Sequence, residues 1–442
     1  MLTRIVDGLN SKKDFPWVIV TPLLYAVGNA AEEVYFGHLK ARRENRRLIL
    51  MRPYYIPFLL DYRLCNKELF DLDSEYCQFH GNGIMVHVFR LLLTVLFTPS
   101  RLLSLFFRKT TGFILKEKYN FPRMGFASIW QEKYTQAFSW ETVNALSWES
   151  QFSAFLDIRL RPVRNEQAVA AFKQLGLKDS DWFVCLHVRE SGFRNDAEKR
   201  PYRNSDIMGY LSAIKEITSR GGWVIRMGDD SMKKLPEMER VIDYPFSKYK
   251  SALMDLYLIK NCRFYLGCQS GILDVAFMFQ KPVVMVNMYN LTFGYPMKRG
   301  DVGIIKHFYS KLKKRYLSSK ELLSAGWEVQ NTEGFLDHEY ILKENLPEEI
   351  KQLVIEYLDH KTLSHESIQI KANKMRVIQA KKSFKKYDAS QESITKLPVA
   401  EQFRYASRLE AVNGCLGLDY LKKTWDHHYL NNKGNDPGTK TQ

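Results

Sequence analysis

The stretch from residue 182 to 227 decides the fold; it reads WFVCLHVRESGFRNDAEKRPYRNSDIMGYLSAIKEITSRGGWVIRM. Its two ends, Trp182–Val188 and Trp223–Met227, are apolar runs interrupted only by His187 and Arg226, which is close to the pattern of strands buried on both faces. Between them, residues 206–220 repeat apolar side chains at helical spacing. A strand, a helix and a second strand in this order predict a parallel β-α-β unit.

Polar residues and glycines mark the two ends of the helix in this unit. Asn204 or Ser205 can cap its start, and Gly221 with Gly222 can end it.

The alternation of strands and helices continues downstream of this unit. Further short apolar strands then alternate with helices, and such a series predicts a parallel sheet covered on both faces. The expected strands are 241–243, 262–267 and 281–287, the expected helices are 251–260 and one starting near Ser270, and an amphipathic helix is expected within 346–360.

The N-terminal part repeats the same pattern. An apolar strand at 17–21 is followed by a Gly28-Asn29 turn, a helix over 30–43 and a strand within 46–53. We therefore expect an α/β protein with two Rossmann-like, doubly wound lobes that face a cleft, joined by a helical linker and finished by C-terminal helices. The expected domains are an N-terminal α/β lobe with a helical insertion at 1–165, a ligand-binding α/β lobe at 166–360 and a basic helical extension with a disordered end at 361–442.

Composition narrows the class of protein. The chain has 442 residues, of which 45% are hydrophobic and 26% charged, so it can bury large cores and is not disordered as a whole. Its net charge of +16 favours phosphate-bearing ligands, polyanions or anionic lipid surfaces, and does not choose among them. The six cysteines form no CxxC pair, and no signal-peptide pattern opens the chain, so we expect a cytoplasmic protein.

One segment leaves two interpretations open. Residues 84–109 are largely apolar but are interrupted by His87, Arg90 and Pro99. They can form two core or domain-packing helices split at the proline. Alternatively, their apolar face can lie on the inner membrane surface, because the basic residues nearby suit anionic headgroups.

Polar residues follow two of the predicted strands directly. Arg189 follows the first strand, where its guanidinium can hold a phosphate through two hydrogen bonds or pair with a nearby carboxylate. Gln269, Ser270 and Gly271 follow the strand at 262–267 and open a helix, whose free amides favour an anion, although Ser270 can also be an ordinary cap. Because parallel strands end at one edge of the sheet, both groups are expected at one ligand site.

Other chemistries find little support. Asp229 and Asp230 follow the strand at 223–227, where they can bind a sugar, accept a proton or form a solvated turn. No metal-binding spacing accompanies them, so we expect no metal. The GxGxxG and P-loop patterns of dinucleotide enzymes and NTPases are absent, and so are the usual nucleic-acid-binding motifs.

Five segments carry a family resemblance, namely CLHVRES (185–191), RNSDI (203–207), GGWVIRMGD (221–229), CRFYLG (262–267) and SGILDVAFMFQKPVVMVN (270–287). In this order the chain resembles, from about residue 15 to 360, a family of bacterial glycosyltransferases. That family is related to the fucosyltransferases with a GT-B-type fold, which include the α1,6-fucosyltransferases and the protein O-fucosyltransferases. The resemblance implies a GT-B-type fold and sugar transfer from a nucleotide donor in surface-glycan or glycoconjugate synthesis.

Two short motifs carry the link. His187-Val188-Arg189 is similar to the HxR element whose arginine holds the diphosphate of the donor in those enzymes. Gly28-Asn29 is similar to their N-terminal Gly-Asn motif on the facing side of the cleft. Two positions depart from the pattern, because Glu190 replaces a second arginine and Ala30 replaces a glutamine. The resemblance thus predicts the reaction class and leaves the sugar open, with GDP-fucose as an extension.

These observations predict a glycosyltransferase that moves a sugar from a nucleoside-diphosphate donor to a hydroxyl of a glycan, a lipid-linked acceptor or a protein. We expect no metal and no other cofactor, because arginine and helix amides can stabilise the leaving diphosphate. The alternative is a non-catalytic module on the same fold that binds anionic lipid or glycan. The candidates for the general base are Glu190, Asp229 and Glu32, with His187 behind them; the candidates for donor binding are Gly28, Asn29, His187, Arg189, Arg203, Asn204, Gln269, Ser270 and Gly271.

Overall fold

The computed structural model describes residues 16–20, 26–50, 65–76, part of 84–95, 157–190, 192, 201–289, 298–324, 339–376, 378 and 414–433. The chain divides into two compact units. The first comprises Met1–Gln136, Ala154–Phe172 and Ser251–Tyr257, and the second comprises Ala137–Ser153, Lys173–Lys250 and Leu258–Gln442. The domain boundaries expected from the sequence stay a prediction.

The first unit opens with the expected β-α-β pattern. Strand β1 (Trp17–Val20) pairs in parallel with β2 (Arg47–Leu50), and helix α2 (Val27–Arg43) contacts both strands. The prediction of a turn at Gly28-Asn29 is wrong, because the helix already includes both residues. The Ala30 amide donates to the Ala26 carbonyl at 2.9 Å, so helical bonding begins ahead of the glycine.

A second group of elements completes the described part of this unit. Strand β3 pairs antiparallel with β4, and Glu68 in the preceding 3₁₀ helix forms an ion pair with Arg164 of α6. These elements are η2 (Lys67–Asp71), β3 (Leu72–Asp73), β4 (Arg159–Leu160) and α6 (Pro162–Lys173).

The apolar segment at 84–109 is described only in part. Its described residues are helical, and Ile84, Val88, Leu91 and Val95 expose their side chains at helical spacing. The rest of the segment, with the proline on which one interpretation depends, lies outside the described residues. Both interpretations therefore stay predictions. Among the described helices, none combines the length and the apolar character that crossing a bilayer requires.

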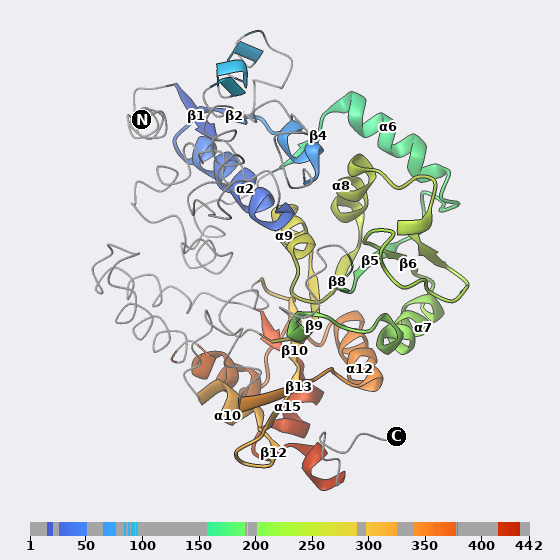
Figure 1. Ribbon diagram of the computed structural model, residues 1–442, viewed down its shortest axis with the longest axis vertical. Coiled ribbons are helices and arrows are strands. Elements are labelled where there is room, and N and C mark those ends of the chain that lie inside the picture. The colour runs from blue at the N-terminus through green and yellow to red at the C-terminus, as the bar shows by residue number, and fades with distance from the viewer. Residues whose placement is uncertain are drawn as a thin grey trace, which may run out of the picture. The chain divides into compact units, whose positions relative to one another are not determined.

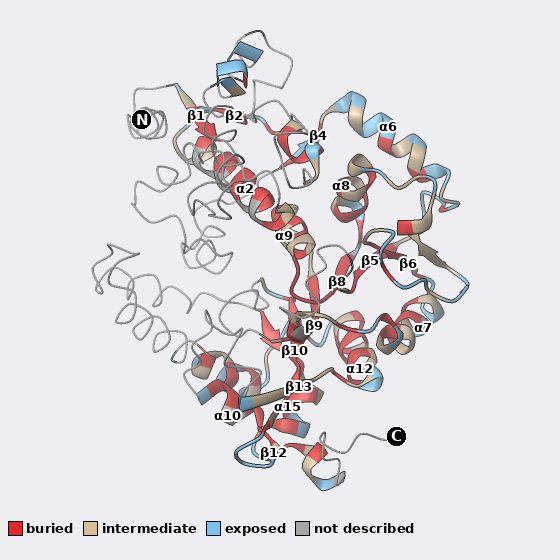
Figure 2. Ribbon diagram, viewed as in Figure 1, coloured by how far each residue is buried: buried red, intermediate tan, exposed pale blue. Residues whose placement is uncertain are grey.

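The second unit is built on one parallel sheet of seven strands in the order β14-β10-β9-β8-β5-β6-β7. Every residue of β5, β8 and β9 is buried, as their continuous apolar sequences predict (Figure 2). The strands are β5 (Phe183–His187), β6 (Trp223–Arg226), β7 (Val241–Asp243), β8 (Phe264–Gly267), β9 (Val283–Met288), β10 (Val302–Ile305) and β14 (Cys415–Leu416).

Helices cover both faces of this sheet (Figure 1). The chain moves from β5 to β6 in one direction and from β8 to β9 in the other, so right-handed crossovers place α7 and α9 on opposite faces. The expected doubly wound α/β fold is confirmed for this unit. Its helical elements are η3 (Pro201–Arg203), η4 (Ile207–Tyr210), α7 (Leu211–Ser219), η5 (Tyr244–Phe246), α8 (Ala252–Asn261), which begins in the first unit, α9 (Gly271–Met278) and α12 (Pro347–Leu358).

The cap of the first helix differs from the sequence prediction. Asp206, and neither Asn204 nor Ser205, caps the helical segment, since its carboxylate accepts from the Met208 amide at 3.1 Å. The segment begins as the 3₁₀ turn η4, which brings the start of the helix closer to residue 206. Asn204 and Ser205 are thereby left in the loop that follows η3.

A small antiparallel sheet and several short helical elements also belong to the described part of the second unit. Strand β11 lies between β12 and β13. Its register places His307 opposite Lys343 and Ser310 opposite Tyr340. These elements are β11 (His307–Ser310), β12 (Arg315–Tyr316), β13 (Tyr340–Lys343), α10 (Ser319–Ser324), α15 (Leu418–Thr424) and η7 (Tyr429–Lys433).

Candidate functional site

The strand order indicates that a ligand binds at the carboxyl-terminal edge of the main sheet. The chain adds β6 and β7 on one side of β5 and then continues with β8, β9 and β10 on the other side. The direction of winding therefore reverses between β5 and β8. In open α/β sheets, ligands bind beyond the carboxyl ends of the strands at such a reversal.

The residues that follow β5 and β8 are in direct contact. Ser270 Oγ lies 3.1 Å from Nδ1 of His187, the last residue of β5. The backbone amide of Arg189 donates to the Cys268 sulfur at 3.2 Å. The sequence prediction of one shared site rested on these two strand ends, and the structure brings them together.

Helix α9 begins at this junction. Gly271 is its first residue, and Ser270 occupies the cap position with an extended backbone. The serine hydroxyl makes no capping hydrogen bond and contacts His187 instead. The first amides of the helix consequently have no partner from the cap side chain, which leaves them able to bind an anion.

Burial controls the protonation of His187. The side chain is 8% exposed, and burial, together with the positive charge of Arg226, lowers the pKa of His187 to about 3. The imidazole is therefore neutral near pH 7 and interacts with Ser270 as a neutral ring. A neutral His187 can hold Ser270 at the start of α9 and does not repel the positive charges nearby.

Asn204 links two cations at this edge of the sheet. Its side-chain oxygen accepts a hydrogen bond from Nη1 of Arg189, and its backbone oxygen accepts one from Nζ of Lys306 at 2.7 Å. The Ser205 amide also donates to the Arg189 carbonyl at 3.0 Å. The loop after η3 is thus held directly over the end of β5.

Arg203 and Gln269 lie in the same region. Arg203 is half-buried, and its Nε is buried with no hydrogen-bond partner among the described residues. The positive charges of Lys306, Arg189 and Arg203 each act to lower the pKa of the Cys268 thiol, although burial dominates and raises it. Gln269 accepts a hydrogen bond from the Tyr289 amide at 3.0 Å, which ties the start of α9 to the end of β9.

The two acidic candidates of the second unit, Glu190 and Asp229, both accept hydrogen bonds from neighbouring residues. Glu190 accepts from Nη2 of the fully buried Arg226 at 3.2 Å and from the Lys233 amide at 2.8 Å. Asp229 accepts from the Ser231 amide at 2.9 Å, as the residues of a tight turn do. Both carboxylates remain at the carboxyl edge of the sheet, and their role in proton transfer stays a prediction.

The other candidates belong to the first unit. Gly28 is buried within α2. The side chains of Asn29 and Glu32 lie outside the described part of the chain. Their expected roles in donor binding and proton transfer stay predictions.

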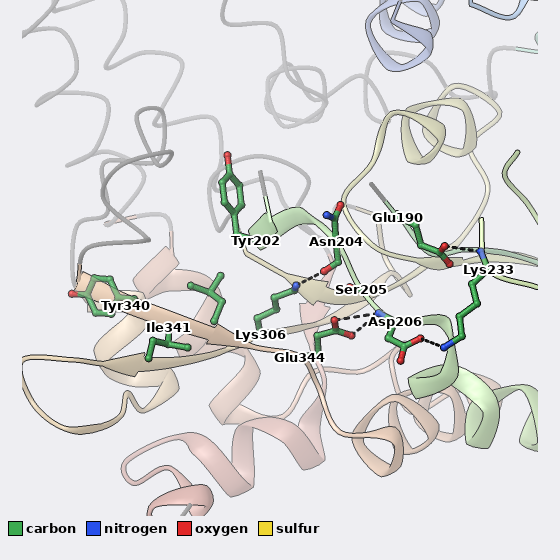
Figure 3. A pocket seen from close by; sticks show the side chains of 11 residues that line it. Glu190, Tyr202, Asn204, Ser205, Asp206, Lys233, Lys306, Tyr340, Ile341 and Glu344 are labelled. Carbon is green, nitrogen blue, oxygen red and sulfur yellow. Dashed lines mark hydrogen bonds and ion pairs between the residues drawn. The ribbon is translucent and has the colours of Figure 1, made fainter. Parts of the chain in front are cut away.

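A cavity of about 570 Å³ opens beside the loop after η3 (Figure 3). Lys306 lies on its wall, and Glu344, which follows β13, lies near Lys306, where its carboxylate accepts from the Asp206 amide at 3.0 Å. Lys306 was not among the predicted site residues. It follows β10 as Arg189 follows β5, so the same rule would have found it if the strand had been recognised. The lining residues are Glu190, Tyr202, Asn204, Ser205, Asp206, Lys233, Lys306, Tyr340, Ile341, Leu342 and Glu344.

Metal-binding side chains do not gather in the described part of the chain. Within it, no group of three or more histidine, cysteine, aspartate or glutamate residues has the spacing of a metal site. Cations and helix amides at the site complement a negatively charged ligand, and the carboxylates of Glu190, Asp206 and Glu344 line the cavity beside them.

Comparison with known proteins gives little beyond this geometry. No protein-family model and no curated protein matches the chain. Among solved structures, a glycosyltransferase of family 9 from Veillonella parvula shares 10% identity over 62% of this chain and 82% of its own, with a TM-score of 0.35. The iron-containing heptosyltransferase TibC, solved with ADP-D-β-D-heptose, shares 16% identity over 26% of this chain, with a TM-score of 0.19. The chain spans only 29% of the length of TibC. Likenesses at these scores assign no activity to the protein.

Proposed function

We propose that the protein is a glycosyltransferase that moves a sugar from a nucleoside-diphosphate donor to a hydroxyl acceptor. The observation that carries the proposal is that the Arg189 backbone contacts Cys268 and the His187 ring contacts Ser270, beside the start of α9 and at the reversal of the strand order. A guanidinium and a row of helix amides together match the oxygens of a diphosphate. The similarity of His187-Val188-Arg189 to the HxR element adds support from the sequence.

The chemistry of transfer fits these groups. When the bond between the anomeric carbon and the diphosphate breaks, its electron pair stays on the leaving diphosphate, which gains negative charge. Donors that already point at this oxygen stabilise that charge without reorganising. Arg189, Arg203 and the amides at Gly271 can fill this role without a metal, and a GDP-fucose-like donor is the first candidate.

The acceptor hydroxyl loses its proton as the new glycosidic bond forms. Glu190 and Asp229 are the acidic candidates in the second unit, and Glu32 is the candidate in the first. A positioned base contributes about 10²–10⁴-fold to a rate. Replacing the base should therefore reduce turnover and leave donor affinity largely intact.

Incubation with a panel of nucleotide sugars, including GDP-fucose, tests the function. We expect that at least one donor releases its nucleoside diphosphate, and that this release accelerates when glycan or lipid-linked acceptors are added. Release can be followed by chromatography of the nucleotides, with heat-denatured protein as the control. Binding of nucleotide sugars without any release would contradict the enzyme and favour a non-catalytic binding module.

A further inference from the structure

Lys306 is a buried cation with few partners. It follows β10 directly, and only 3% of the residue is exposed. Its ammonium carries three N–H donors, and among the described residues it donates one hydrogen bond, to the backbone oxygen of Asn204 at 2.7 Å. No carboxylate of the described residues forms an ion pair with it.

Such burial is unfavourable unless another group compensates the charge. An ammonium removed from water loses its hydration, and one neutral carbonyl replaces only part of it. Burial accordingly lowers the pKa of Lys306, while the charge of Glu344 and the nearby Cys268 act in the opposite direction. The two remaining donors of this ammonium call for acceptors that the described chain does not supply.

The surroundings show which ligand fits. Asn204 is shared between Lys306 and Arg189, so the two cations contact the same residue. Arg203 completes the group, since all three positive charges act on the Cys268 thiol at the end of β8. Arg189 and Lys306, which share Asn204 at the ends of β5 and β10, match with the nearby Arg203 an anion of more than one negative charge.

The cavity provides the space for this anion. Lys306 and Asn204 both line the cavity of about 570 Å³, and Figure 3 shows the lysine side chain extending along its wall to the Asn204 carbonyl. Cavities of roughly 300–1,000 Å³ accommodate ligands of the size of nucleotides and sugars. Arg189 itself does not line this cavity, but its guanidinium contacts Asn204, which does.

We propose that Lys306 is a third phosphate-binding group, whose ammonium donates hydrogen bonds to the diphosphate of the donor and stabilises it as the leaving group. This inference rests on the proposed function and extends it to a residue with no assigned role. The ammonium keeps its protons throughout the reaction. It contributes charge and hydrogen bonds, and the electron pair of the broken bond remains on the diphosphate oxygen.

The Lys306→Met variant separates a binding role from a structural one. Methionine keeps the length of the side chain and removes the charge, so the melting temperature should be unchanged or higher, as for other buried charges that are removed without leaving a partner charge. Affinity for ADP, GDP, UDP and inorganic pyrophosphate, measured by titration calorimetry, should fall by about 10- to 100-fold for those that bind the wild type. Lys306→Arg should lose less, because it retains the charge.

Lys298→Met is the matched control. The Lys298 ammonium also donates to a backbone carbonyl at 2.7 Å, that of Lys281, but this residue does not line the cavity. We expect nucleotide affinity to stay within about twofold of the wild type in this variant.

The possible outcomes distinguish the role of Lys306 from the proposed function of the protein. Unchanged affinity in Lys306→Met would overturn the role of this lysine and leave the proposed function standing. A lower melting temperature or failure to fold would overturn it too, because it would show a structural role. If the wild type bound no nucleoside diphosphate, the proposed function itself would fail, and the inference with it.

Discussion

Replacement of Arg189 by alanine is expected to weaken nucleoside-diphosphate binding by about 100-fold or more. Two charge-assisted hydrogen bonds from one guanidinium to phosphate oxygens account for a loss of this size. Arg189→Lys should be nearly as damaging, because a single ammonium cannot reproduce the planar pair of donors. Titration calorimetry with the nucleotide that the wild type binds best measures both losses.

A surface arginine of the same unit provides the control for this measurement. Arg220 forms ion pairs with Glu216 and Asp359 at the end of α7 and takes no part in the site. The Arg220→Ala variant should bind the nucleotide as the wild type does. Equal affinity in Arg189→Ala and Arg220→Ala would remove Arg189 from the diphosphate site.

The second large effect is expected on stability, from Arg226. This residue of β6 is fully buried, and its guanidinium pairs with Asp243 at 2.9 Å and with Glu190 at 3.2 Å. Arg226→Ala leaves both carboxylates without their cation, so we expect the second unit to lose about 3–5 kcal/mol of unfolding free energy. Urea denaturation followed by circular dichroism measures the loss.

Arg220→Ala again serves as the comparison, because Arg220 also has two acidic partners but lies at the surface. Surface ion pairs contribute about 0–1 kcal/mol. A similarly small loss of unfolding free energy in both variants would show that the buried Arg226 stabilises the fold no more than the surface Arg220. It would also weaken the view that Glu190 is held in place by this cation.

Strands that are continuous apolar runs could be predicted from the sequence. β5, β6, β8 and β9 are such runs, broken only by His187, Arg226 and Asn287, and each lies where its pattern placed it. β10 was not predicted, because its four residues include a glycine and lie next to another short strand. Its neighbour β14 has only two residues and follows more than a hundred positions later, so its pairing is decided by tertiary contacts and leaves no local signal.

The candidate site could be predicted only where its residues follow strands that the sequence reveals. The neighbouring positions of Arg189 and Ser270 could be predicted, because both follow recognisable strands and parallel strands bring such positions together. Their roles in binding stay predictions. Lys306 was missed with β10. The burial of Arg226 left no sign in the sequence either, because its partners Glu190 and Asp243 come from two other strand ends.

The central claim is that the guanidinium of Arg189 and the first amides of α9 hold one diphosphate. Crystals soaked with a nucleoside diphosphate test it most directly. We expect two phosphate groups whose oxygens lie about 3 Å, a hydrogen-bond distance, from the Arg189 guanidinium and from the amide at Gly271. Phosphate density that contacts neither group, or a nucleotide bound elsewhere on the chain, would contradict it.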